Sequence, residues 1–175
     1  MDFNQKYNDN WIYGYKMFKD NLTNQYGEKF EIGKIYKDPN IGKKYGFHFC
    51  KNIEDTMIFS NYGGYKDSNL EFYEVCGKGM TFYYENDYVG LYDVYATEEL
   101  KVLKKLMREE ILDIFLLMDP YFGQFRLERF LSLFKLNDEE ILLFKKKFIN
   151  DNKILRMITY FQENDKDAFI KKRIK

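Results

Sequence analysis

The spacing of apolar residues along the chain changes from a strand-like to a helix-like period near residue 107. Before that point, short stretches rich in aromatic and β-branched residues alternate with turn-forming residues, which is typical of β-strands. One helix is predicted within this half, at 52–60, because Asn52 is a suitable N-cap and Asp55 follows three residues later. The segment 98–106 fits either a helix or a strand. The predicted strands are 11–18, 29–36, 45–50, 69–76, 80–85 and 88–95.

From Arg108 onward the apolar residues follow a helical period. Ile111, Ile114, Phe115 and Met118 fall at i, i+3, i+4 and i+7, which places them on one face of a helix. The same template recurs at 127–134 and at 154–161, and the acidic run 137–140 is a capping signal for a helix that extends to 148. With a fifth helix at 165–173, this half is predicted to be a bundle of four or five short helices.

These two periods predict an α+β protein, with an antiparallel-rich sheet and one short helix followed by a C-terminal helical bundle. We place the domain boundary at 107, giving a sheet domain at 1–107 and a helical domain at 108–175. The charge is also divided, since residues 1–100 have a net charge of −5 and residues 101–175 one of +5. The helical domain is therefore the more basic part of a chain whose total charge is zero.

Composition narrows the class of protein. With 45% apolar and 32% charged residues, the chain can bury a core. It has two cysteines, a polar amino terminus, and a longest apolar run of five residues at 114–118. These features predict no disulfide framework, no signal peptide and no membrane helix, which would need about 20 apolar residues. We expect a soluble cytoplasmic protein inside a host cell, with association to a virion left open.

His48 and Glu74 are the candidate catalytic residues. His48 is the single histidine, and its ordinary pKa suits a general base, although we favour a packed histidine whose ring nitrogens bond to backbone groups. Glu74 shares a predicted strand face with Phe72 and Cys76, where an unpaired carboxylate would be costly to bury. A bulge, or an ion pair with a lysine, is the alternative explanation for Glu74.

Other site chemistries have less support. A metal site would require His48, Cys50 and Cys76 to converge without the ligand spacings that zinc sites use, so we predict no metal. The glycine pairs at 63–64 and 77–79 lack a phosphate-binding framework and are interpreted as turns. The lysines at 145–147 and the basic residues at 171–175 fit a solvated helix face better than a nucleic-acid site.

Several motifs in the first half occur in a recognisable order. They are Tyr13-Gly14-Tyr15-Lys16, Phe30-Glu31-Ile32-Gly33-Lys34-Ile35-Tyr36, Gly46-Phe47-His48-Phe49-Cys50 and Phe72-Tyr73-Glu74-Val75. Residues 11–107 thereby resemble an uncharacterised domain family of phages, bacteria and large DNA viruses. The resemblance implies an α+β fold, a viral or phage origin and a strand at 100–106, but it implies no activity.

A second resemblance is to the ADP-ribosyltransferases of the poly-ADP-ribose polymerase type. Their Gly-Ile-Tyr-Phe-Ala motif is similar to 46–50, with His48 in place of the tyrosine and Phe59 near the position of a second tyrosine. Tyr13-Gly14-Tyr15 replaces their His-Gly pair. Under this alternative, NAD would be the cofactor, and Tyr13, Gly46, Phe47 and Phe59 would bind it.

The function that we predict from the sequence is a non-catalytic interaction or structural protein without a cofactor. Its partner would be another protein or a second copy, bound through the helical domain and aromatic surfaces, because aromatic residues are enriched at interfaces. No membrane partner is expected. The alternative is an NAD-dependent ADP-ribosyltransferase-like enzyme, or a degenerate relative, with His48 and Glu74 as its catalytic residues.

Overall fold

The computed structural model describes residues 4–38, 46–61, 70–85, 93–118, 120–134 and 136–163. Contacts divide the chain into two compact units, Met1–Ile111 and Leu112–Lys175, which we call the sheet unit and the helical unit. The chain is α+β, as predicted. The elements are β1 (Asn4–Lys19), β2 (Ile35–Lys37), β3 (Phe47–Cys50), η1 (Ile53–Asn61), β4 (Leu70–Glu85), β5 (Asp93–Lys105), α1 (Arg108–Leu117), α2 (Pro120–Leu133), α3 (Asp138–Lys147) and α4 (Asn152–Glu163).

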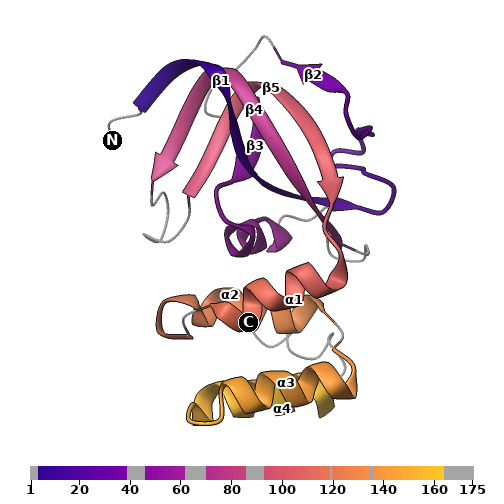
Figure 1. Cartoon of the computed structure of the whole chain (residues 1–175), viewed down its shortest axis with the longest axis vertical. Helices are drawn as coiled ribbons and strands as arrows, with labels where there is room; N and C mark the ends of the chain where they lie inside the picture. The colour runs from indigo at the N-terminus through magenta and orange to yellow at the C-terminus, as the bar shows by residue number, and fades with distance from the viewer. Residues whose placement is uncertain are drawn as a thin grey trace. The chain divides into compact units, whose positions relative to one another are not determined.

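Four strands of the sheet unit close into a ring, as the curved ribbons of Figure 1 show. β1 pairs with β4, β4 with β5, and β5 with β3, all antiparallel. The ring closes where Tyr15 of β1 lies opposite Cys50 of β3. β2 adds a short strand beside β5. Because a closed ring leaves few strand edges unpaired, it shields the backbone groups that would otherwise recruit other strands.

The interior of the ring is filled by aromatic and aliphatic side chains. Phe49 lies at the centre, where a Cβ atom added to Gly14 or Gly77 would come within 2.7 Å of its ring. The absence of side chains at these two positions therefore makes room for the phenyl ring. The buried members of this core are Phe18, Phe30, Phe49, Tyr73, Val75, Leu100 and Val102.

The helix predicted at 52–60 is a 3-10 helix, η1, that packs against β1 and β3. Ile53 and Met57 are buried. Asn52 Nδ2 donates to Asp55 Oδ2 at 3.0 Å, which is a contact between side chains, whereas a capping box joins each side chain to the backbone amide of the other residue. The residues of η1 have little helical amphipathicity, and 3-10 segments commonly serve as connectors between other elements.

The strands differ from the prediction in length. The segments 69–76 and 80–85 belong to one strand, β4, in which Gly79 has a φ of +83° within a bulge opposite Glu98. The glycines at 77 and 79 therefore bend the strand instead of ending it. The segment 98–106, ambiguous by period, lies mostly in β5. The predicted strand 29–36 is reduced to β2 and isolated bridges at Lys29 and Ile32.

The helical unit has its own aromatic core. The rings of Phe115 and Phe130 are stacked at 3.9 Å between centroids, and the ring of Phe144 lies 5.9 Å from that of Phe130. α3 begins with the predicted cap, in which Asn137 Oδ1 accepts from Glu140 N at 2.9 Å and Glu140 Oε2 accepts from Asn137 N at 2.8 Å. The helix predicted at 165–173 lies outside the described residues.

Candidate functional site

His48 occupies the face of β3 that points away from the interior of the ring. Its neighbours Phe47 and Phe49 pack into the core, and successive residues of a strand point to opposite faces. The residue opposite His48 on β5 is Ala96. The His48 carbonyl oxygen accepts a hydrogen bond from Lys16 Nζ at 2.6 Å. The imidazole is partly buried.

This environment keeps the imidazole neutral. Burial, and secondly the charge of Lys16, lower the pKa of His48 to about 4. At neutral pH the ring is therefore unprotonated. With so low a pKa it is too weak a base to accept a proton efficiently near pH 7. Burial likewise lowers the pKa of Lys16 to about 8. The pair has the character of a packed histidine beside a buried amine, which is one of the two interpretations that the sequence allowed.

Glu74 lies on β4 and forms an ion pair. Its Oε1 atom is 3.4 Å from Lys104 Nζ on β5, and the same ammonium group lies 2.8 Å from Glu110 Oε1. These side chains are between one third and one half exposed. A half-exposed ion pair of this kind contributes little free energy to folding. The lysine partner that the sequence offered as an alternative for Glu74 is thus present.

The structure does not pair His48 with Glu74. β1 lies between β3 and β4, and the β1 residue opposite Glu74 is Tyr15, which lies opposite Cys50 on its other side. The charge that acts on the pKa of His48 is that of Lys16 and not that of Glu74. The register therefore brings Glu74 next to Tyr15 and not next to His48.

The four residues expected to bind NAD under the alternative lie in different surroundings. Tyr13 is 67% exposed on β1, opposite Cys76. Gly46 precedes β3 with a φ of +97° and donates from its amide to Asp38 Oδ2 at 2.9 Å. Phe47 packs against the Phe30 ring in the core. Phe59 belongs to η1 and is partly buried.

The two cysteines, Cys50 and Cys76, are buried thiols and are not joined by a disulfide. Burial raises the pKa of Cys76, so its reactive thiolate form is scarce at neutral pH. Within the described ranges, no group of three His, Cys, Asp or Glu side chains could hold a metal ion. Likewise, no described helix has the length and apolar character needed to cross a membrane.

Sequence reasoning missed Lys16. Its place between Gly14 and Phe18 in an alternating strand would have assigned it to the inward face, where a lysine is rare. The structure gives the ammonium group the His48 carbonyl as an acceptor, with Phe18 beneath it at 5.7 Å from Nζ to the ring centroid. Such an arrangement ties β1 to β3, so Lys16 is a structural residue of the ring closure.

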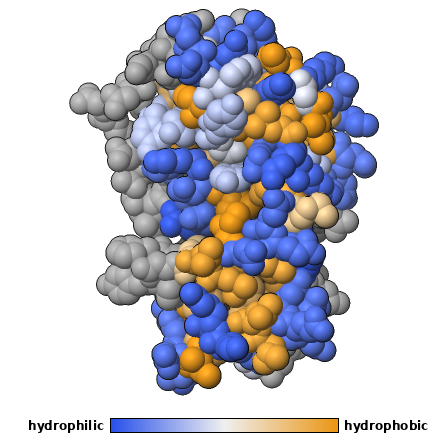
Figure 2. All heavy atoms as spheres, viewed as in Figure 1, coloured by the Kyte–Doolittle hydropathy of each residue, from blue (hydrophilic) through white to orange (hydrophobic). Residues whose placement is uncertain are grey.

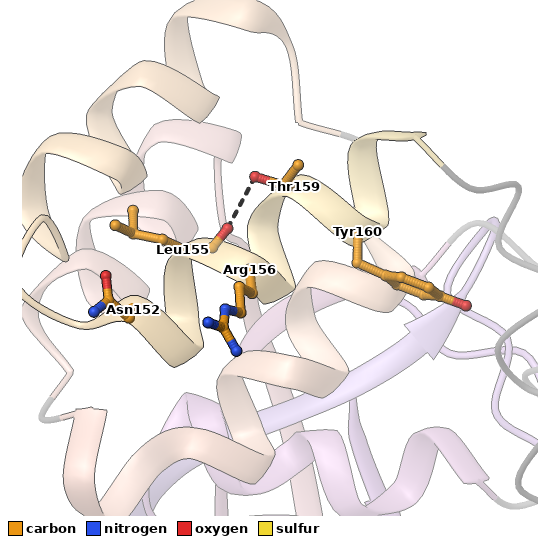
Figure 3. A pocket seen from close by; sticks show the side chains of 5 residues that line it. All are labelled: Asn152, Leu155, Arg156, Thr159 and Tyr160. Atoms are coloured by element: carbon orange, nitrogen blue, oxygen red, sulfur yellow. Dashed lines mark hydrogen bonds between the residues drawn. The ribbon is translucent and has the colours of Figure 1, made fainter.

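A shallow hollow of about 400 Å³ lies along α4 of the helical unit (Figure 3). All five lining side chains belong to this one helix, and Thr159 Oγ1 donates to the Leu155 carbonyl at 3.0 Å. Arg156 is the charged member. A surface of this shape can receive a side chain of another molecule, but it gathers no nucleophile with a base. The lining residues are Asn152, Leu155, Arg156, Thr159 and Tyr160.

Comparison with known proteins gives one family match. The family model described as "Domain of unknown function (DUF7666)" matches residues 12–114, which is more than half of the chain. The matched segment begins within β1, contains the other strands and η1, and ends within α1. No curated protein and no solved structure matches the chain significantly.

Proposed function

We propose that this chain, which belongs to the DUF7666 family of domains of unknown function, is a non-catalytic interaction protein. In this proposal, the helical unit binds another protein or a second copy of the chain. A viral or phage origin, and a place in a virion, remain predictions.

The observation that supports the proposal most directly is the exposed apolar surface of α3. Leu142 and Leu143 are 68% and 53% exposed, and Ile149, just past the helix, is 65% exposed. Figure 2 shows hydrophobic side chains at the surface of the helical unit. Isolated apolar residues are common on protein surfaces, but two adjacent exposed leucines on one short helix, with an exposed isoleucine just past its end, favour a contact surface.

The exposed leucines of α3 are separate from the side chains by which this helix packs into its unit. The opposite face of α3 already buries Ile141 and Phe144, and Phe144 reaches the stacked aromatic rings of the helical unit. The helix therefore has one apolar face for the fold and a second for which the described part of the unit supplies no cover.

Support for a non-catalytic role comes from the separation of His48 from Glu74 and from the low pKa of His48.

Site-specific photo-crosslinking tests the proposal. A benzophenone amino acid replaces Leu143 in the full chain, and a control carries it at Tyr26, a more exposed residue of the sheet unit. In expressing cells, we expect one defined crosslinked species from position 143 and none of that mass from position 26. Leu142→Ser should abolish the product at 143. Equal crosslinking at both positions, or none at 143, would contradict an interaction through α3.

A second arm addresses catalysis. We expect NAD to leave the melting temperature of the chain unchanged and to transfer no label to proteins in the same cells. A clear stabilisation by NAD that is lost in His48→Gln, with transfer of labelled ADP-ribose, would replace this proposal with the transferase alternative.

A further inference from the structure

The exposed face of α3 carries an ordered stripe of four residues. Glu139, Leu142, Leu143 and Lys146 follow one another at i, i+3, i+4 and i+7, so they lie on a single face of the helix. All four side chains are exposed. The buried residues of α3 lie on the other side of the helix. We call these four residues the α3 stripe.

The α3 stripe has an acid at one end, a base at the other and two leucines at its centre. We propose that it binds the α3 stripe of a second copy of the chain, with the two helices antiparallel. This inference rests on the proposed function and names the occupant of that same surface. Around a twofold axis between positions 142 and 143, Glu139 meets Lys146 of the partner subunit at both ends of the contact. The four leucines pack together across the axis.

The charges select the direction of packing. A parallel pair would bring Glu139 to the partner's Glu139, and Lys146 to the partner's Lys146. Like charges in contact are destabilising by about as much as opposite charges stabilise. The antiparallel arrangement converts both repulsions into attractions, and it does so with residues that lie at the edge of the leucine contact.

The same charges favour a second copy over a partner of one sign. A purely acidic helix would repel Glu139, and a nucleic acid would do the same, whereas a purely basic partner would repel Lys146. Within the described residues, neither Glu139 nor Lys146 takes part in an ion pair of the chain itself. Both groups are thus available to an intermolecular contact that satisfies the two ends together.

The size of the surface predicts the strength of the association. α3 has 10 residues and is about 15 Å long. One helix pair of this length falls at the low end of specific interfaces, which begin at about 1,200 Å² of buried area. We therefore expect a reversible dimer whose population depends on protein concentration, rather than a permanent one.

Charge reversal tests both the contact and its direction. Sedimentation equilibrium over about two decades of concentration compares the wild type with Glu139→Lys, Lys146→Glu and the double variant, all as full-length chains. Each single variant creates two like-charge contacts, so the dimer dissociation constant should rise about tenfold or more. The double variant restores opposite charges and should return to within about threefold of the wild type.

An equimolar mixture of the two single variants provides a sharper readout. One chain then has lysine at both ends of the stripe and the other has glutamate at both ends, so the heterodimer should form more strongly than either homodimer. Far-UV circular dichroism checks that the exposed substitutions leave the helices intact.

Two results would overturn the inference. One is a wild-type chain that stays monomeric over the whole concentration range, and the other is dimerisation that is equal in all four chains. The inference can fail while the proposed function stands. A monomeric wild type that still crosslinks a different protein at position 143 would refute the second copy as occupant and would support the interaction role.

Discussion

Lys16 reaches across the ring closure of the sheet unit and donates a hydrogen bond from Nζ to the carbonyl oxygen of His48 at 2.6 Å. The two residues belong to β1 and β3, which within the described residues are paired through the backbone at Tyr15 and Cys50 only. The side-chain bond is therefore a second tie between these strands. It also places a positive charge near the single imidazole of the chain, which lowers the pKa of that ring.

The single histidine makes this relationship measurable by NMR titration. We expect the His48 ring protons to titrate with a pKa of about 4 in the wild type. In Lys16→Met the pKa should rise because the neighbouring charge is gone, but it should stay below 6.5 because burial, the larger cause, remains. A wild-type midpoint near 6.5 would show that the ring is solvated, and an unchanged pKa in the variant would show that Lys16 exerts no electrostatic effect.

The lowered pKa of His48 also predicts a pH dependence of stability. Between pH 6.5 and about 4 the unfolded chain binds a proton at His48 that the folded chain does not, so stability falls as the pH falls through this window. The full shift corresponds to about 3 kcal/mol, and the partial exposure of the ring reduces our expectation to about 2 kcal/mol. Urea unfolding of the wild type and of His48→Gln at several pH values isolates this contribution from those of the carboxylates. Parallel curves for the two proteins would contradict the buried, neutral ring.

The close packing of Phe49 against glycines predicts a large cost for a small substitution. In Gly77→Ala the new methyl group would lie 2.3 Å from Thr97 Oγ1 and 2.7 Å from the Phe49 ring, so the core must shift. We expect a loss of about 3 kcal/mol in the free energy of unfolding. Gly27→Ala is the control, because it has open space and suffers only from its φ of +88°, which costs about 1 kcal/mol. Equal losses in the two variants would mean that the ring interior is looser than described.

The helical unit depends on the central position of Phe130. This ring is fully buried and stacks on Phe115 at 3.9 Å and on Phe134 at 4.6 Å. Phe130→Ala should cost about 4 kcal/mol, measured by chemical unfolding that follows helical circular dichroism. Leu117→Ala, at a side chain that is 79% exposed, should change stability by less than about 0.5 kcal/mol. A cost below 1 kcal/mol for Phe130→Ala would show that the stacked rings are not the core of this unit.

The class of the fold and the helices were predictable because local signals decide them. The stripe at Ile111, Phe115 and their neighbours and the cap at Asn137 each depend on residues within two turns of a helix. The closure of the sheet was not predictable from period, because it depends on which distant strands meet. The pairing of Tyr15 with Cys50 joins residues that the sequence separates by the whole of β2 and its loops.

For the candidate site, too, local features could be predicted from the sequence and contacts between distant residues could not. The alternation in β3 correctly separates His48 from Phe47 and Phe49, but the pKa of His48 depends on Lys16, a residue of another strand. Glu74 has a lysine partner that no local pattern could identify, because Lys104 follows a bulge in a different strand. The α3 stripe was visible in the sequence as a second set of residues at helical spacing, alongside the buried set at Ile141 and Phe144.

The short pairing of β1 with β3 has a consequence for local opening of the ring. Within the described residues, one residue pair and the Lys16 hydrogen bond join β1 to β3, whereas β4 pairs with β1 and with β5 along long ladders. We therefore expect local opening of the ring to begin between β1 and β3. Cys50, the β3 residue of this pair, is fully buried. Modification of Cys50 by a thiol reagent therefore requires local opening, and its rate measures how often the structure around this residue pair opens.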